Sequence, residues 1–365
     1  ARESGQLARL GHVERWRGVS LLARGETMAA RRAFERSLAI ARQAGDDLNR
    51  SWSANNLAIT HAVEGDFEGA LELYAEARAA HERTGFVLGT LVADNNVADL
   101  MLDRGRLDEA DEMARRVLAV AREQGNHAFE IENLGRLVRV ALARGDLEGA
   151  DRLLGEAMEV MREHEVELPQ IEVDRARLEL ALGNVDEASR WARRALDASD
   201  GDSMQMQMQR LPALRVFAAV EAAAGRLARA RHHASAARRL AVEAGMPFFT
   251  AALDRDLARL ARWRGEHREA ASRLDAALAM HRRAGAELEV GHDLVELAEL
   301  QLADGSSAAA EESARQAIAI FERLGAWAGV HAANELLRRG PSRSGLPPGN
   351  TVAAVPSPHA ERIGW

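Results

Sequence analysis

Glycine recurs along this chain at a nearly constant spacing of forty residues, and this period limits the possible folds more than any other feature. The steps between successive glycines are 40, 40, 40, 38, 42, 40 and 40 residues. A fixed period of this length indicates a row of similar units that stack on one another, instead of two or three closed domains. We call these residues the anchor glycines: Gly25, Gly65, Gly105, Gly145, Gly183, Gly225, Gly265 and Gly305.

Small residues hold fixed positions around the anchor glycines. An alanine stands five residues after every anchor, and mostly small residues stand twelve after and seven before. Such positions suit helices that approach closely, because a larger side chain would push their axes apart. The alanines five residues after the anchors are Ala30, Ala70, Ala110, Ala150, Ala188, Ala230, Ala270 and Ala310.

The pattern predicts an all-α stack of about eight antiparallel helix pairs with a closing helix, over residues 1–340. In each unit a first helix ends at the anchor glycine, and a second helix of about eighteen residues follows. In six of eight units the second helix meets a further glycine. Polar residues after the anchors, such as Asp66, Asp146 and Asn184, are expected to cap second helices. The prolines near expected starts of first helices are Pro169, Pro212 and Pro247.

The spacing of small residues and glycine over residues 5–325 resembles the tetratricopeptide repeat (TPR), although that repeat usually has 34 residues. The longer units are similar to those in the C-terminal arms of bacterial signal-transducing ATPases, including maltose-regulator-like transcription factors. Residues 317–339 resemble the last unit and closing helix of such an arm. The resemblance implies a right-handed α-solenoid that binds a protein or peptide on its concave side and serves a larger transcriptional regulator.

Composition excludes several chemistries. The chain has 73 alanines, no cysteine and no lysine, so thiolate catalysis, cysteine-bound zinc, a P-loop and Schiff-base chemistry have no residues to carry them. A net charge of −8 argues against direct binding to nucleic acid or to an anionic membrane. Without a signal-peptide core or a long apolar run, the chain is expected in the cytoplasm.

The last segment, residues 341–365, is rich in proline, serine and glycine and is predicted to be a disordered tail. It stands where many relatives carry a DNA-binding helix-turn-helix. Because the chain also begins at Ala1 without methionine, we interpret it as a piece of a larger regulator with an ATPase domain upstream.

Local motifs give little support for catalysis or metal binding. The Gly201-Asp202-Ser203 sequence has the order of a lipase nucleophile block, but no strand is predicted to present it. The alternating Met-Gln run at 204–209 offers thioethers for copper, although a flexible connector is the preferred interpretation. No His-Glu-x-x-His spacing occurs, and the short turns leave no material for a catalytic cleft. We therefore expect no enzyme activity, no metal and no cofactor.

The candidate binding residues are implied by the resemblance, which places first-helix positions ten, six and three before each anchor in the concave groove. Asparagine pairs with peptide backbone and arginine grips carboxylates, so these residues suit an acidic peptide or protein segment. The alternative is that the arginines are ordinary surface residues beside aspartate and glutamate. The positions hold Asn55, Asn95, Asp99, Arg139, Arg177, Arg215, Arg255, Arg259 and Arg262.

The sequence thus predicts a sensor arm whose ligand lies in the groove of an open superhelix with its two ends far apart. Three alternatives remain open at this stage: a free-standing receptor for a signal peptide, a passive scaffold, and a helical toroid enzyme, which requires a closed ring.

Overall fold

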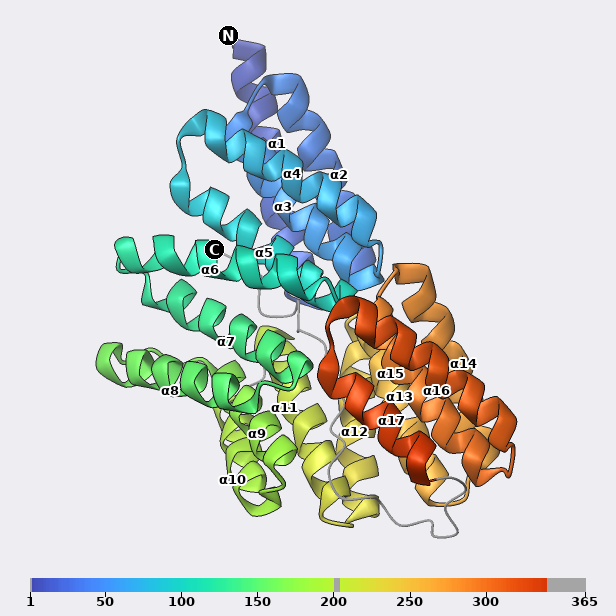
Figure 1. The fold of residues 1–365 in the computed structure, drawn as a ribbon. Coiled ribbons are helices and arrows are strands. Elements are labelled where there is room, and N and C mark those ends of the chain that lie inside the picture. Colours follow the sequence, from blue (N-terminus) through green and yellow to red (C-terminus); the bar gives the residue numbers. More distant parts are fainter. Residues whose placement is uncertain (1, 200–203, 340–365) are drawn as a thin grey trace.

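The structure is a computed structural model that describes residues 2–199 and 204–339. Its described residues form seventeen helices and no strand, in consecutive antiparallel pairs (Figure 1). The first helices are α1 (Arg2–Leu22), α3 (Asp47–Glu64), α5 (Val87–Arg104), α7 (His127–Arg144), α9 (Pro169–Leu182), α11 (Met204–Ala223), α13 (Pro247–Trp263) and α15 (Glu287–Ala303). The second helices are α2 (Thr27–Ala44), α4 (Phe67–Thr84), α6 (Leu107–Glu123), α8 (Leu147–His164), α10 (Val185–Ala198), α12 (Leu227–Glu243), α14 (His267–Ala284) and α16 (Ser307–Leu324), and α17 (Trp327–Arg339) closes the stack.

Glycine ends the helices where the period predicts. All eight anchor glycines have positive φ values, between 75° and 87°, and the six further glycines have φ between 63° and 68°. Glycine adopts this left-handed conformation without the steric penalty of a side chain. In the fourth unit Glu165 takes the same place with φ 53°, the one positive-φ residue other than glycine in the described ranges.

The small positions pack helices together as expected. The alanines five residues after the anchors are at most 1% exposed, and the residues seven before the anchors are buried as well. At Gly18 a Cβ would lie 2.4 Å from the ring of Phe34, so this position admits no larger residue without a shift. The burial confirms the predicted all-α repeat and its register.

Three local expectations need correction. Pro212 lies inside α11, because that helix begins eight residues earlier, at Met204, and so takes up the run expected to form a connector. Asn184 makes no capping hydrogen bond; its Nδ2 donates to Glu179 instead. Asp66 and Asp146 do cap their helices, accepting from the amides three residues on. The Gly201-Asp202-Ser203 sequence and the predicted tail lie outside the described residues.

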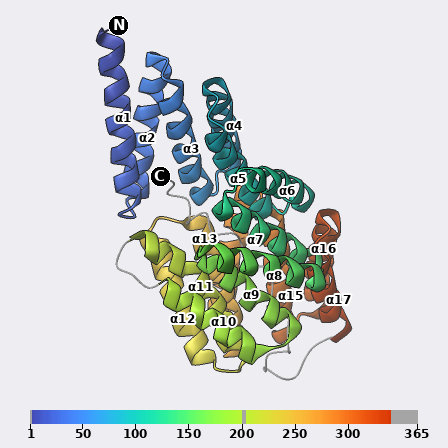
Figure 2. The ribbon, with the colours of Figure 1, turned by 90° about the vertical axis from the view of Figure 1, so that its left-hand side faces the viewer.

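The stack winds into a superhelix whose successive turns touch. Helix α3 contacts α13, α5 contacts α15, and α7 contacts α17, each pair five units apart. Figures 1 and 2 show these late helices beside the early ones, while α1 and α17 lie at opposite ends. At Gly65 a Cβ would lie 2.4 Å from Cε of Met280, which shows how closely the turns pack. The ends are therefore apart as predicted, but the expected open arm is a wound, self-contacting one.

Candidate ligand-binding face

The predicted groove residues all lie on first helices, and we call the side of those helices that carries them the inner face. This face is less open than the sequence implied, because most of its members are almost fully covered. Arg139, Arg259 and Arg262 retain 10%, 17% and 11% side-chain exposure. Six others are at most 4% exposed: Asn55, Asn95, Asp99, Arg177, Arg215 and Arg255.

Amide side chains link the early units of the inner face. Nδ2 of Asn96 donates to Oδ1 of Asn55 at 2.8 Å, and Nδ2 of Asn133 donates to Oδ1 of Asn95 at 2.9 Å. Asn95 in turn donates to Glu132 at 2.6 Å. The amides thus connect neighbouring first helices, since a buried amide without partners would cost stability.

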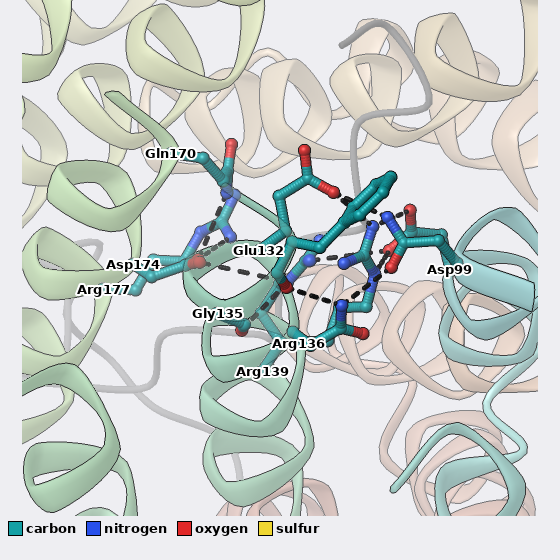
Figure 3. A network of polar contacts seen from close by, with 11 residues as sticks. Asp99, Glu132, Gly135, Arg136, Arg139, Gln170, Asp174 and Arg177 are labelled. Atoms are coloured by element: carbon teal, nitrogen blue, oxygen red, sulfur yellow. Dashed lines mark hydrogen bonds and ion pairs between the residues drawn. The ribbon is translucent and has the colours of Figure 1, made fainter. Parts of the chain in front are cut away.

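Ion pairs continue the inner face through α5, α7 and α9 (Figure 3). Arg136 donates to both carboxylate oxygens of Asp99, from Nε at 2.8 Å and from Nη2 at 3.1 Å. Arg139 lies between two carboxylates, 3.5 Å from Asp99 and 3.9 Å from Asp174. Arg177 donates from Nη1 to Asp174 at 2.5 Å. One chain of charges therefore crosses three units.

The later units carry closer pairs. Arg255 lies 2.6 Å from Glu289 and 3.2 Å from Asp293, and all three side chains are at most 2% exposed. Nδ1 of His281 lies 2.6 Å from the other oxygen of Asp293. Burial alone would lower the pKa of Arg255, but the two carboxylates outweigh it and raise that pKa.

Two further arginines bind acidic side chains one unit on. Arg215 contacts Asp256 at 2.5 Å, and Arg259 contacts Glu296 at 2.6 Å. Burial raises the pKa of Asp256, but Arg215, Arg255 and Arg259 together outweigh that effect, and the net shift is downward. Arg262 also reaches Glu296, at 3.5 Å. These residues hold first helices together, so replacing them tests stability as much as binding.

Sequence reasoning missed the residues that pair with the predicted groove set. Five of these partners share one repeat position, nine residues before the anchor glycine, where polar or charged side chains recur in six of the seven later units. That recurrence was a readable signal, because a repeat position that stays polar on a close-packed face needs partners. The residues at this position are Asn56, Asn96, Arg136, Asp174, Asp256 and Glu296, with Val216 the exception.

Elsewhere the described residues offer little for other chemistry. They contain no group of three or more histidine or acidic side chains placed to hold a metal ion. No helix among them is both long and apolar enough to cross a membrane. A cleft of about 300 Å³ between α6, α7 and α8 is lined by Arg115, Arg144, Asp111 and Glu156, whose charges pair with one another or with neighbours.

Solved structures share this fold at low sequence identity. A Rap protein complexed with competence and sporulation factor matches at 12% identity and a TM-score of 0.54, covering 90% of this chain and 97% of that one. The Rap conjugation gene regulator of plasmid pLS20, in complex with the Phr* peptide, matches at 12% identity and a TM-score of 0.61, covering 78% and 77%.

A signal-transduction ATPase of the STAND class with a TPR sensor, from Pyrococcus horikoshii, matches at 15% identity and a TM-score of 0.44, covering 84% of this chain and 49% of that one. No curated protein matches the sequence. The family model described as the MalT-like TPR region matches residues 6–219, more than half of the chain. With its forty-residue helix pairs and their buried small positions, the chain belongs to the MalT-like TPR family.

Proposed function

We propose that the chain is a protein- or peptide-binding TPR module and acts as the sensor arm of a larger bacterial signalling or transcriptional regulator. The observation that carries this proposal is the inner face, where amides and guanidinium groups line successive first helices through six units. Some of its buried donors and acceptors remain without partners within the described residues, including Arg177 Nη2 and Gln170 Oε1. A peptide main chain supplies both a carbonyl oxygen to accept from Arg177 and an N–H group to donate to Gln170.

Two similar structures support a ligand of this kind. One Rap protein was solved with the Phr* peptide and another with competence and sporulation factor. At 12% sequence identity, the likeness extends to the fold alone. The residues that would contact a peptide must therefore be argued from this chain.

As a sensor arm, the module would pass ligand binding on to an ATPase domain in the same polypeptide. The ligand must then prefer one arrangement of the superhelix. Contacts between successive turns, such as Thr27 with Ala244, are the ones that such a rearrangement would break or form. The coding sequence upstream of Ala1 tests this part: a Gly-rich loop followed by Lys and Ser or Thr supports it, and a start codon at Ala1 contradicts it.

A free-standing receptor for a signal peptide is the second candidate. It is favoured by the Rap likeness that spans 90% of this chain and 97% of the Rap chain, so no ATPase is needed to complete that fold. The upstream sequence separates the two candidates, and both place the peptide on the inner face.

Peptide binding is tested with an equimolar pool of fluorescein-labelled random pentapeptides. We expect the full chain to raise the anisotropy of the pool and Arg139→Gln, on the inner face, to weaken binding about tenfold. The matched control is Arg193→Gln on the exposed side of α10, which should bind like the wild type. No binding by the wild type, or equal loss in both variants, contradicts the proposal.

A further inference from the structure

Arg177 keeps one edge of its guanidinium group without a partner although the side chain is only 4% exposed. Nη1 donates to Asp174 at 2.5 Å, but Nε and Nη2 have no hydrogen-bond partner among the described residues. Oε1 of Gln170, seven residues and about two turns earlier on α9, also lacks a hydrogen-bond partner there. Leaving buried donors unpaired is costly, so a group that binds them would recover that cost.

The open edge has the shape that grips carboxylates elsewhere in this chain. Arg136 uses Nε and Nη2 on the two oxygens of Asp99, at 2.8 and 3.1 Å. Arg238 uses the same two nitrogens on Asp254, also at 2.8 and 3.1 Å. Two parallel N–H groups match the two oxygens of a planar carboxylate. The vacant edge of Arg177 is therefore fitted to a carboxylate.

The charge around Arg177 favours an added anion. Its partner Asp174 is shared with Arg139, at 3.9 Å, and with Gln170, which donates at 3.3 Å. Burial lowers the pKa of Arg177 to about 10; Asp174 opposes that fall, while Arg139 and Arg215 add to it. One shared carboxylate thus leaves the Arg177 cation undercompensated.

Arg255 is a comparator within the same chain. It is fully buried, and its Nε and Nη2 also lack partners in the described part of the chain. Its charge, however, already faces Glu289 at 2.6 Å and Asp293 at 3.2 Å, which together raise its pKa. A third carboxylate there would meet two like charges. The same open edge therefore suits a neutral carbonyl at Arg255 and a carboxylate at Arg177.

We propose that the inner face binds one ligand carboxylate at Arg177, with both oxygens on Nε and Nη2 and with Arg139 and Arg215 flanking it. This rests on the proposed function and names the chemistry that part of the inner face recognises: a peptide C-terminus or an aspartate or glutamate side chain. The ligand would approach past Glu132 and Arg139, which keep 29% and 10% side-chain exposure.

Four labelled, N-acetylated pentapeptide pools test the proposal, with a C-terminal acid or amide and with Glu or Gln at one fixed position. We expect the full chain to bind at least one carboxylate-bearing pool about tenfold more tightly than the pool with Gln and an amide. The acid and Glu pools distinguish the two carboxylate sources. Arg177→Gln should abolish the preference but retain the weaker binding, and the control Arg193→Gln should keep the preference.

A second measurement separates this site from peptide binding. Potassium succinate, compared with potassium chloride at equal ionic strength, should raise the thermal midpoint of the wild type, because an anion bound only to the native state stabilises it. Neither Arg177→Gln nor Arg177→Met should show that rise. A rise that depends on Arg177 without any peptide binding supports the site and contradicts the peptide-binding function. Peptide binding without any carboxylate preference overturns the site and leaves the function standing.

Discussion

The hydroxyl of Thr27 donates a hydrogen bond to the main-chain carbonyl of Ala244 at 2.5 Å, across 217 residues of sequence. The bond joins the start of α2 in the first unit to the turn between α12 and α13. It is a direct link between successive turns of the superhelix.

Replacing Thr27 with valine keeps the side-chain volume but leaves the Ala244 carbonyl without this donor. We expect the free energy of unfolding to fall by about 1 kcal/mol, measured by urea denaturation. Thr60→Val is the control, because that hydroxyl bonds to the Leu57 carbonyl within α3 and joins no turns. A loss at Thr27 no greater than at Thr60 would show that the contact does not stabilise the wound form.

Arg255 should prove far more important for stability than Arg177, although both are buried on the inner face. Arg255→Met leaves Glu289 and Asp293 buried without their guanidinium partner, and we expect a loss of about 3–5 kcal/mol. Arg177→Met removes a cation that one shared carboxylate compensates, so its stability should stay within about 1 kcal/mol of the wild type. Chemical denaturation of both variants decides the matter. Equal losses would mean that Arg177 is an ordinary structural ion pair.

His81 predicts a pH dependence of stability. Its ring is fully buried against Trp52 and Phe86, and burial lowers its pKa from 6.5 to about 4. Between these pH values the unfolded chain takes up a proton that the folded chain does not, so this contribution to stability falls as pH drops from 6.5 to 4.

We expect His81 to account for about 1–3 kcal/mol of that fall. His81→Leu should flatten the curve of unfolding free energy against pH in this window. His331→Leu, at an exposed position of α17, serves as the control. An unchanged slope in the His81 variant would rule out this residue as the cause.

Glu165 holds a backbone conformation that glycine adopts in six other units. Its φ of 53° places a side chain in the left-handed region, which is unfavourable for residues other than glycine. Glu165→Gly should therefore raise the unfolding free energy by about 0.5–1 kcal/mol. The same change at Glu163, inside α8, should lower it by a similar amount. If thermal denaturation showed Glu165→Gly to be less stable and Glu163→Gly more stable than the wild type, this account of the turn would be contradicted.

Periodicity predicted the fold because each unit obeys local rules. An anchor glycine ends a helix through its own backbone freedom, and a buried alanine reflects one close helix contact, so both can be read from spacing. The contact of Thr27 with Ala244 could not be predicted from spacing, because it depends on the superhelical rise summed over five units.

For the candidate residues, the sequence predicted their place on the first helices but not how far they are covered. The resemblance placed residues such as Arg215 and Arg255 on the inner face, but their exposure depends on the partners that cover them. Asp256 lies 41 residues beyond Arg215, and Glu289 lies 34 residues beyond Arg255, each on the next first helix. Small differences in helix rotation decide whether such pairs form, and spacing alone does not specify them.

Site mapping by cross-linking tests the central claim, binding on the inner face, most directly. The full chain is mixed with a random pentapeptide pool that carries a photoreactive leucine, irradiated, and digested for mass spectrometry. We predict cross-links on α7, α9 and α11, the first helices that surround Arg177 and Arg139. Cross-links confined to the outer helices α8, α10 and α12, or none above the level of the urea-unfolded chain, would contradict it.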